Sequence, residues 1–393
     1  MKKRIALILA LLLCVGVTAC ALGGAQEEKV HQIGVIVYNL GDEEVISFRE
    51  YLQGYIEKNF EMVKFVYSDS ITSQEQEMDF IRDACASGVE GFLSFRTYDL
   101  SAEVALCEQN KAYYLLASGT VTDKDFNAVA DNPWFLGMFG PGGEAEYKAR
   151  HDMAAHFITE HSPKRFFILS GGAGKGNERH YQRTLGIIDA ILDMMSIKYS
   201  GTRPQFAATE KLNSFTSGDV TITVCPGYVA RDEAAFNTAR DALNAGDYDV
   251  VMAVLPPVDL TNYLHKAELG VVDSFNNRNL QLSANGTLDY VVGKYSSSVG
   301  PAAMLMLNAV SGSAEDFREN GKAIKVVVPF WTAAGKDDYL AKHSLATSVS
   351  MNAYDFEDLS KVCRIYNPKA TLQELITLAK ASSYEDVLAR RSE

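Results

Sequence analysis

Apolar and polar residues follow one another along this chain in two rhythms, one typical of buried strands and one typical of helices. Residues 33–38 form an uninterrupted apolar run of strand length, which is the pattern of a parallel strand covered on both faces. After a polar loop, the apolar side chains of residues 45–60 recur at three- and four-residue spacing. That spacing predicts an amphipathic helix directly after the strand.

This unit of one strand and one helix repeats along the chain. The predicted strands occupy 33–38, 62–67, 91–95 and 113–117 in a first series, and 135–139, 165–169, 220–224, 250–255, 270–273, 288–292 and 324–328 in a second. Alternation of this kind specifies α/β layers with right-handed crossovers. Because the strands are too many for one sheet and fall into two series, we predict two Rossmann-like, three-layer α/β lobes with parallel sheets.

The first residues predict export from the cytoplasm. Lys2, Lys3 and Arg4 precede an uncharged apolar run, residues 5–17, which ends in the sequence Val-Thr-Ala-Cys. A basic start, a short apolar stretch and small residues before a cut are the features of a secretory signal, and the run is too short to span a bilayer. Cysteine after the cut resembles the bacterial lipobox, which implies a signal peptide over 1–19, a lipidated Cys20 and a linker over 20–31. A plain signal peptide with an incidental cysteine is the alternative.

Charge and length narrow the class of protein. The chain has 393 residues, with 37 basic and 50 acidic side chains and a net charge of −13. Removing the signal also removes three basic residues, so the mature chain is more acidic still. An acidic protein cannot release counterions from phosphates, which argues against a nucleic-acid partner. No second apolar stretch reaches membrane-spanning length, so the lipid is the expected anchor in the cell envelope.

Cysteine and histidine offer no ligand set of familiar spacing. Outside the signal and Cys20, the cysteines are Cys85, Cys107, Cys225 and Cys363, without any C-x-x-C pair. We expect buried free thiols, with a disulfide between Cys85 and Cys107 as the alternative. His151, His156 and His161 recur every five residues, which places successive ones about 140° apart on a helix. We therefore expect neither a metal site nor a cofactor.

No set of residues in the sequence indicates an enzyme active site. The loop over 170–176 is rich in glycine and contains a Gly-Lys pair, but Leu169 stands where a phosphate loop needs its first glycine, and Gly176 replaces the hydroxyl residue. No G-x-S-x-G or H-E-x-x-H motif occurs. We expect a protein that is not an enzyme.

Several segments together resemble the type I periplasmic binding proteins, the sugar- and nucleoside-binding components of ABC importers, whose fold is shared by LacI-type regulators. The resemblance rests on the lipoprotein signal before 33–38, on the helix–glycine–strand step at 86–93, and on the segments 164–172, 183–187, 246–253 and 288–300. It covers about residues 33–330 and is one of pattern more than identity. A signal peptide where DNA-binding helices would stand argues against a regulator.

The resemblance implies a domain arrangement in which the chain crosses three times between lobes, through a three-stranded hinge near Ala130, Lys294 and Asn320. The first lobe would hold 32–130 and 295–320, and the second lobe 131–294 and 321–331. Residues 332–393 have no counterpart in the family. They carry two helical signals, at 372–381 and 384–390, and we expect them to form a helical C-terminal appendage on one lobe.

The resemblance also implies a ligand cleft between the lobes, contacted by loops at the carboxyl ends of the strands. Reading those loops along the sequence gives the expected ligand-binding residues. They are Asn39, Asp42, Glu43, Arg96, Ser118, Tyr181, Arg183, Tyr228, Asp259, Asn276 and Lys294.

The ligand class stays open at this point. Sugar-binding members place aromatic rings after the first strand, where this chain has Glu43, Glu44 and Val45, and an aspartate after the strand at 270–273, which falls near Phe275 or Asn276. Tyr181, Tyr228 and Phe275 could instead stack on a planar ring, so a nucleoside competes with a sugar.

We expect a lipid-anchored protein that captures a small polar solute and delivers it to an ABC permease. The alternatives are a ligand-sensing lipoprotein that signals to a membrane receptor or kinase, and an envelope enzyme on the same scaffold.

Overall fold

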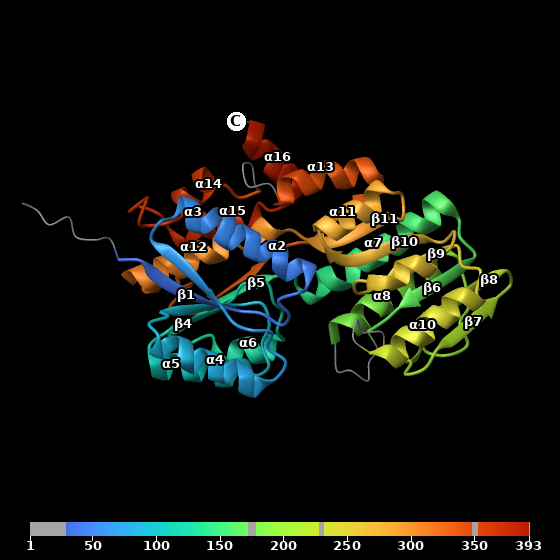
Figure 1. Cartoon of the computed structure of the whole chain (residues 1–393), viewed down its shortest axis with the longest axis horizontal. Coiled ribbons are helices and arrows are strands. Elements are labelled where there is room, and N and C mark those ends of the chain that lie inside the picture. The colour runs from blue at the N-terminus through green and yellow to red at the C-terminus, as the bar shows by residue number, and fades with distance from the viewer. Residues whose placement is uncertain (1–28, 172–177, 228–231, 348–352, 393) are drawn as a thin grey trace, which may run out of the picture. The chain divides into compact units, whose positions relative to one another are not determined.

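Two β-sheets organise the part of the chain that the structure describes (Figure 1). The computed structural model describes residues 29–171, 178–227, 232–347 and 353–392. From His31 onward these residues form one compact unit. The expected signal peptide and Cys20, most of the glycine loop and Tyr228 lie outside the described residues.

The first sheet has six parallel strands in the order β12-β5-β4-β3-β1-β2. Its strands are β1 (His31–Ile36), β2 (Val63–Tyr67), β3 (Gly91–Ser94), β4 (Tyr113–Leu116), β5 (Phe135–Gly140) and β12 (Ile324–Val327). Its helices are α2 (Glu43–Tyr51), which continues through a π-helical turn (Leu52–Ile56) into α3 (Glu57–Asn59), and α4 (Gln74–Ala86), α5 (Leu100–Asn110), α6 (Asp123–Val129) and α12 (Gly300–Asn308).

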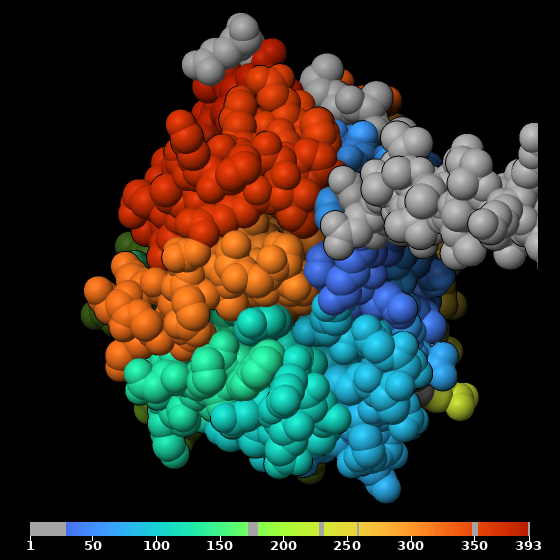
Figure 2. All heavy atoms as spheres, turned by 90° about the vertical axis from the view of Figure 1, so that its left-hand side faces the viewer, coloured from blue at the N-terminus to red at the C-terminus, as the bar shows by residue number. Residues whose placement is uncertain are grey.

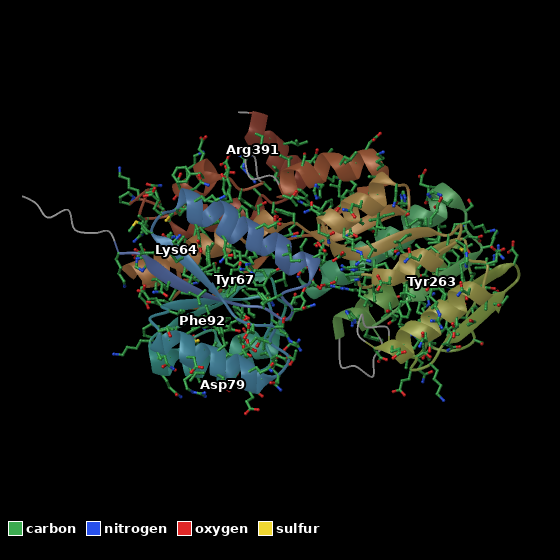
Figure 3. All side chains as sticks on the ribbon, viewed as in Figure 1. Lys64, Tyr67, Asp79, Phe92, Tyr263 and Arg391 are labelled. Atoms are coloured by element: carbon green, nitrogen blue, oxygen red, sulfur yellow. The ribbon has the colours of Figure 1, made fainter. Side chains whose placement is uncertain are left out.

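Alternate strand residues face opposite layers of helices. Val35 and Leu93 belong to the buried cluster that includes Phe48 of α2. The neighbouring Phe92, labelled in Figure 3, belongs to a second cluster under α4 and α5. Its ring centroid lies 6.0 Å from that of Phe80. Apolar residues on both faces therefore make the first lobe three-layered, as the continuous apolar runs predict.

The second sheet has seven strands in the order β13-β11-β10-β9-β6-β8-β7, parallel except for its two edge strands. Its strands are β6 (Arg165–Leu169), β7 (Asn213–Ser217), β8 (Val220–Cys225), β9 (Val250–Ala253), β10 (Glu268–Ser274), β11 (Leu288–Lys294) and β13 (Trp331–Ala334). Its helices are α7 (Gly143–His161), α8 (Glu178–Met194), α9 (Arg203–Ala207), α10 (Glu233–Ala245) and α11 (Asn277–Ala284). Two α/β lobes are confirmed.

Two expected lobe boundaries differ from the observed topology. The strand expected to open the second lobe, β5, pairs with β4, so the chain leaves the first sheet after Gly140 and not near Ala130. The strand after Asn320, β12, pairs with β5, and the chain crosses to the second sheet only to form β13. Strand rhythm fixes where strands lie, but the sheet each one joins depends on long-range pairing.

Gly137 shows why β5 belongs beside β12. Its φ of 140° is accessible to glycine alone, and a Cβ at this position would lie 2.0 Å from the carbonyl oxygen of Ile324. The close approach of the two backbones therefore depends on the absence of a side chain.

The C-terminal extension consists of α13 (Gly335–Thr347), α14 (Phe356–Lys361), α15 (Leu372–Lys380) and α16 (Tyr384–Ser392). The two helices expected in it are present. The extension contacts both lobes rather than one: Tyr339 of α13 donates a hydrogen bond to the carbonyl of Asn276, whereas Tyr51 of α2 donates one to the carbonyl of Tyr354. In Figure 2 the red C-terminal residues lie directly on the orange segment that includes α12.

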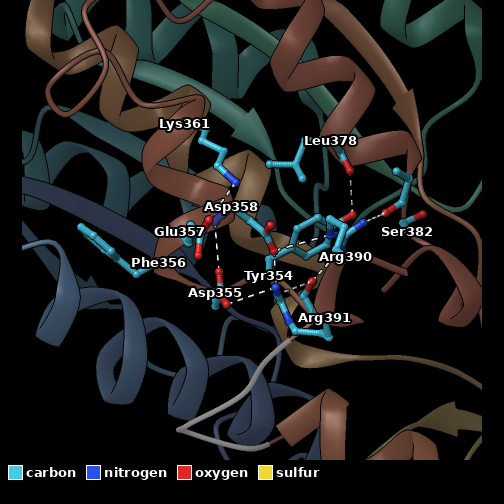
Figure 4. A network of polar contacts seen from close by, with 12 residues as sticks. Tyr354, Asp355, Phe356, Glu357, Asp358, Lys361, Leu378, Ser382, Arg390 and Arg391 are labelled. Atoms are coloured by element: carbon cyan, nitrogen blue, oxygen red, sulfur yellow. Dashed lines mark hydrogen bonds and ion pairs between the residues drawn. The ribbon is translucent and has the colours of Figure 1, made fainter. Parts of the chain in front are cut away.

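Arginines of α16 contact residues at the start of α14 and just before it, within the same extension (Figure 4). Arg391 lies 2.6 Å from Asp358 and 3.1 Å from Asp355, and the guanidinium of Arg390 lies over the ring of Tyr354 at 4.9 Å. Arg390 also donates a hydrogen bond of 2.7 Å to the carbonyl of Ala353. These pairs are largely buried, so we expect them to hold α16 against the start of α14.

An aromatic stack joins two of the segments that run between the lobes. Tyr295 follows β11 and Trp331 begins β13, and their ring centroids lie 3.9 Å apart at an interplanar angle of 21°. The Tyr295 hydroxyl and the Trp331 indole N–H both donate to the carbonyl oxygen of Ser382, at 2.9 and 2.7 Å. One carbonyl of the extension therefore holds both crossing segments.

The four cysteines of the described residues are free, as expected, and three of them are buried. In the same part of the chain, no helix is long and apolar enough to cross a membrane.

A glycine substitution tests the observed boundary of the first lobe. We expect Gly137→Ala to lower stability by about 2 kcal/mol or more, because the added Cβ meets the backbone of β12 at a strained φ. Thermal unfolding of the purified protein measures this. Gly54→Ala is the matched control, since nothing lies within 4 Å of its added Cβ and helical alanine is favourable. Equal melting temperatures for the two variants would contradict the β5–β12 contact.

Candidate ligand cleft

A cavity of about 820 Å³ lies where the carboxyl ends of strands from the two sheets meet. Residues at or after the ends of β1, β3, β4 and β5 and one residue of β12 contribute from the first sheet. Residues after β9, residues of β10 and β11, and residues of the helix after β6 contribute from the second. Its polar lining comprises Tyr38, Asp42, Glu44, Arg96, Thr97, Thr120, Thr122, Asp123, Glu146, His180, Gln182, Arg183, Asp273, Lys294 and Lys325. The volume and the convergent polar groups are typical of small-molecule sites.

Three carboxylates from both lobes gather on one side of the cavity. Asp42 is the N-cap of α2 and accepts hydrogen bonds from the Glu44 amide at 3.0 Å and from the Tyr38 hydroxyl at 3.1 Å. Burial, together with the nearby Glu44, raises the pKa of Asp42. At the end of β10, Asp273 is the third carboxylate of this group.

Asp273 has a strongly perturbed carboxyl group. Burial is the main cause, and the negative charges of Asp42 and Glu44 add to it, so that its pKa rises to about 8. The side-chain amides of Asn276 and Asn279 donate to its Oδ2 at 3.0 and 2.7 Å and partly offset the rise. At neutral pH this carboxyl is largely protonated and can donate as well as accept a hydrogen bond.

Lys294 links the two lobes beside this acidic group. It is the last residue of β11 in the second sheet, and its Nζ lies 2.9 Å from Glu44 and 3.1 Å from the carbonyl oxygen of Ser118, both in the first lobe. Each partner is mostly buried, so this ion pair is screened less than a surface pair.

The opposite side of the cavity is built around Glu146 of α7. Its carboxylate accepts two hydrogen bonds from Arg183, at 2.8 and 3.2 Å, and lies 2.8 Å from the fully buried Arg150. Arg183 also donates to the carbonyl of Val254, which fixes its orientation at the cavity wall. Burial lowers the pKa of Arg150, whose guanidinium lies 4.4 Å from the ring centroid of Phe330.

Arg96 and three aromatic rings complete the lining. Arg96 follows β3, is exposed, and lies 4.0 Å from the ring centroid of Tyr98. Tyr38, Phe95 and Phe330 bring aromatic surface to the cavity from three different segments. The site thus combines carboxylates, fixed guanidinium groups and ring faces.

The structure brings four of the sequence-predicted residues to this cavity: Asp42, Arg96, Arg183 and Lys294. Six others lie elsewhere, namely Asn39, Glu43, Ser118, Tyr181, Asp259 and Asn276. Asp259 is 76% exposed beside Arg278, and Asn276 is fully buried as the N-cap of α11. Ser118 contributes its carbonyl to Lys294, while Tyr228 lies outside the described residues.

Two of the three aromatic residues expected to stack on a planar ring, Tyr181 and Phe275, do not line this cavity, and the third, Tyr228, lies outside the described residues. Phe275 is fully buried and stacks on Tyr339 with ring centroids 5.2 Å apart, and Tyr181 packs against the core. An aspartate does line the cavity from this strand, namely Asp273, two or three residues before the expected position.

Sequence reasoning missed Glu44, Glu146 and Asp273. Glu44 and Glu146 lie in the first turn of a helix after a strand of the first sheet, a position that the search for loop residues passed over. Asp273 is the last residue of the strand predicted at 270–273, and only the loop residues after that strand were considered, although the last strand residues also line the cavity. Including the first turn of the helix after each strand and the last two residues of each strand finds all three.

Comparisons with known proteins bear on the fold. No model of a known protein family matches the chain, and no curated protein matches it. Solved structures do match. An ABC transporter solute binding protein from Bacillus halodurans C-125 with bound myo-inositol has a TM-score of 0.56 at 15% identity, covering 81% of this chain and 99% of that one. A periplasmic solute binding protein from Actinobacillus succinogenes 130z with bound D-allose has a TM-score of 0.57 at 14% identity, covering 79% and 99%.

The transcription regulator CcpA of Lactococcus lactis also matches, with a TM-score of 0.53 at 12% identity over 78% of this chain and 99% of that one. At these identities the likeness shows the fold alone, which is the two-lobe fold of type I periplasmic binding proteins. About a fifth of this chain has no counterpart in these structures.

The raised pKa of Asp273 predicts a pH-dependent stability. The folded protein holds this proton up to a pKa of about 8, whereas an unfolded chain releases it near pH 4, so folding stability falls as pH rises between these values. We expect Asp273→Asn to remove this part of the pH dependence and to exceed the wild type in melting temperature by at least about 2 °C at pH 8.5. Asp259→Asn, on an exposed carboxylate, is the control; identical pH profiles for Asp273→Asn and the wild type would refute the assignment.

Proposed function

We propose that this protein is an extracytoplasmic, lipid-anchored solute-binding protein that captures a small polyhydroxylated ligand between its two lobes and delivers it to an ABC transporter. The observation that carries the proposal is the cavity of about 820 Å³, to which both sheets contribute charged side chains at the carboxyl ends of their strands. A site shared by two lobes couples ligand contact to lobe closure.

The lining supports a sugar-like or cyclitol-like solute. Carboxylates such as Asp42 and Glu44 accept hydrogen bonds from hydroxyl groups, Arg96 and Arg183 donate them, and Tyr38 and Phe330 offer apolar ring faces. Matching proteins were solved with myo-inositol and with D-allose. Of the three aromatic residues that favoured a nucleoside, Tyr181 and Phe275 do not line the cavity, and Tyr228 lies outside the described residues.

Closure would take place at the segments that connect the lobes after β5, β11 and β12. A ligand that contacts Asp42 or Arg96 in the first lobe and Asp273 or Arg183 in the second binds the closed arrangement better than the open one. The free-energy difference between the open and closed arrangements shifts by the difference in binding free energy of the ligand for the two, and by no more. Lys294, paired with Glu44 across the lobes, is positioned to respond to a ligand that displaces either group.

Anchoring and delivery rest on separate support. The sequence over residues 1–20 supports a lipid on Cys20, and the similarity to solute-binding proteins of ABC transporters supports delivery to such a transporter. Those proteins were solved with bound solutes, which agrees with a binding role.

A sensor that reports ligand to a membrane receptor or kinase is the second candidate. The C-terminal extension favours it, because these helices contact both lobes and would present a surface that changes with closure. Ligand-dependent stimulation of a permease ATPase in proteoliposomes identifies the transporter role. Ligand-dependent binding to a kinase ectodomain identifies the sensor.

A binding screen tests the solute class. We expect sugars or cyclitols, rather than nucleosides, to raise the melting temperature, since a ligand at a hundred times its Kd stabilises by about 2.7 kcal/mol. Arg96→Ala should weaken the best ligand roughly 10- to 150-fold in calorimetry, which corresponds to about 1.5–3 kcal/mol for a charged hydrogen bond. Asp259→Ala, predicted from sequence but outside the cavity, should leave affinity unchanged. Absence of any hit, or equal losses in both variants, would count against this cleft.

The anchor is tested by metabolic labelling with a fatty-acid analogue in a bacterial host. We expect label on the wild-type protein and none on Cys20→Ala, because only the first residue after the cut is lipidated. Cys14→Ala, within the expected signal peptide, is the matched control and should stay labelled. Label that persists in Cys20→Ala would overturn the lipoprotein assignment.

A further inference from the structure

A cluster of two histidines and two carboxylates lies on the second lobe, apart from the cleft. His156 and His161 come from α7, Glu268 begins β10, and Asp289 is the second residue of β11 (elements in Figure 1). The cluster lies at the amino ends of β10 and β11, whereas the cavity lies at their carboxyl ends. Nothing in the solute-binding proposal uses these side chains.

The five-residue spacing of His156 and His161 does not keep their rings apart. Residues five apart point about 140° away from each other in a continuous helix. His161, however, is the last residue of α7, and Ser162 turns the chain with a left-handed backbone (φ 49°, ψ 47°). The two imidazole centroids lie only 5.8 Å apart.

A β-bulge contributes to the placement of Asp289. Leu269 pairs with Leu288 and Gly270 pairs with Tyr290, so Asp289 is the extra residue in the register between β10 and β11. Bulges redirect side chains next to functional sites. Here the Asp289 Oδ2 atom lies 2.9 Å from His156 Nε2 and 3.5 Å from His161 Nε2.

These atoms have the spacing of metal ligands. One atom each from His156, His161 and Asp289 lie within 4.8 Å of one another. Tetrahedral Zn²⁺ with bonds of about 2.0–2.2 Å places its ligand atoms about 3.3–3.6 Å apart. Two of the separations, 2.9 and 3.5 Å, lie near that range, and the third, between one nitrogen of each ring, is within 4.8 Å.

Glu268 adds the orienting contact that metal-binding histidines usually have. His161 Nδ1 lies 2.6 Å from Glu268 Oε2, which leaves Nε2 toward Asp289. A carboxylate on the second ring nitrogen fixes the tautomer and raises the basicity of a ligand. The four side chains are 19–39% exposed, so an ion has access and a water can take the fourth position.

We propose that His156, His161 and Asp289 bind a first-row transition-metal dication such as Zn²⁺, with Glu268 positioning His161. Two imidazoles and one carboxylate suit Zn²⁺ better than Mg²⁺ or Ca²⁺, which prefer oxygen ligands. The bound ion ties the C-terminal end of α7 to β10 and β11 and stabilises the second lobe.

Calorimetry with ZnCl₂ on untagged, chelator-treated mature protein tests the site. We expect one Zn²⁺ per chain and no binding of Mg²⁺. His161→Ala should weaken Zn²⁺ at least 100-fold, and Glu268→Gln by about 10- to 100-fold, as for other second-sphere carboxylates. His151→Ala is the matched control, because this histidine lies on the same helix but beside Asp152. It should bind Zn²⁺ as the wild type does.

Asp289→Asn guards against a folding artefact, since it keeps the side-chain shape while removing the charged ligand. Two results together support the site. The metal-free variants melt at the same temperature as the metal-free wild type, and Zn²⁺ raises the melting temperature only in the wild type and in His151→Ala. No Zn²⁺ binding, or equal binding in every variant, overturns it and leaves four groups that form ion pairs only. Solute binding in the cleft is measured separately and does not depend on either result.

Discussion

The carbonyl oxygen of Ser382 is the point on which the arrangement of the lobes depends. It accepts hydrogen bonds from Tyr295 and Trp331, whose rings stack at 3.9 Å in two of the segments that run between the sheets. Tyr295, Trp331 and Ser382 are all buried. Breaking either hydrogen bond would therefore leave a buried polar group without a partner, at a cost of several kcal/mol. Each residue that lines the cavity belongs to one of the two lobes. The distance between the two groups of lining residues therefore depends on how the segments that carry Tyr295 and Trp331 are held. The extension that supplies the carbonyl therefore holds two of the segments on which the spacing of the cavity walls depends.

The fold could be predicted well wherever local pattern decides it. Buried parallel strands read as apolar runs, and the three- and four-residue spacing over 45–60 becomes the helix that runs from α2 into α3. The sheet to which β5 and β12 belong could not be read in this way, because both are ordinary apolar strands. Their pairing rests on contacts nearly 190 residues apart in the chain, and local pattern carries no record of such a contact beyond the single glycine at 137.

The site was only partly predictable for a related reason. Strand ends point to the cleft, and this rule finds Asp42, Arg96, Arg183 and Lys294. It overlooks Glu44 and Asp273, which occupy a helix and a strand, and it includes Asn276, whose side chain instead caps α11 and supports Asp273. Whether a polar side chain at such a position faces the cavity or the backbone depends on rotation about one or two of its bonds. The packing of neighbouring residues determines that rotation, and the composition of the sequence does not show it.

The position of Ser382 in the chain also orders events during synthesis. A polypeptide emerges from the ribosome with its amino end first, so every strand of both sheets, ending with Ala334, exists before residue 382 is added. The sheets can pair while Tyr295 and Trp331 still lack their common acceptor. The contacts that hold both crossing segments to the extension therefore form last, when the final helices dock. A nascent chain halted before residue 382 would contain every strand of both sheets and would lack the acceptor that Tyr295 and Trp331 share.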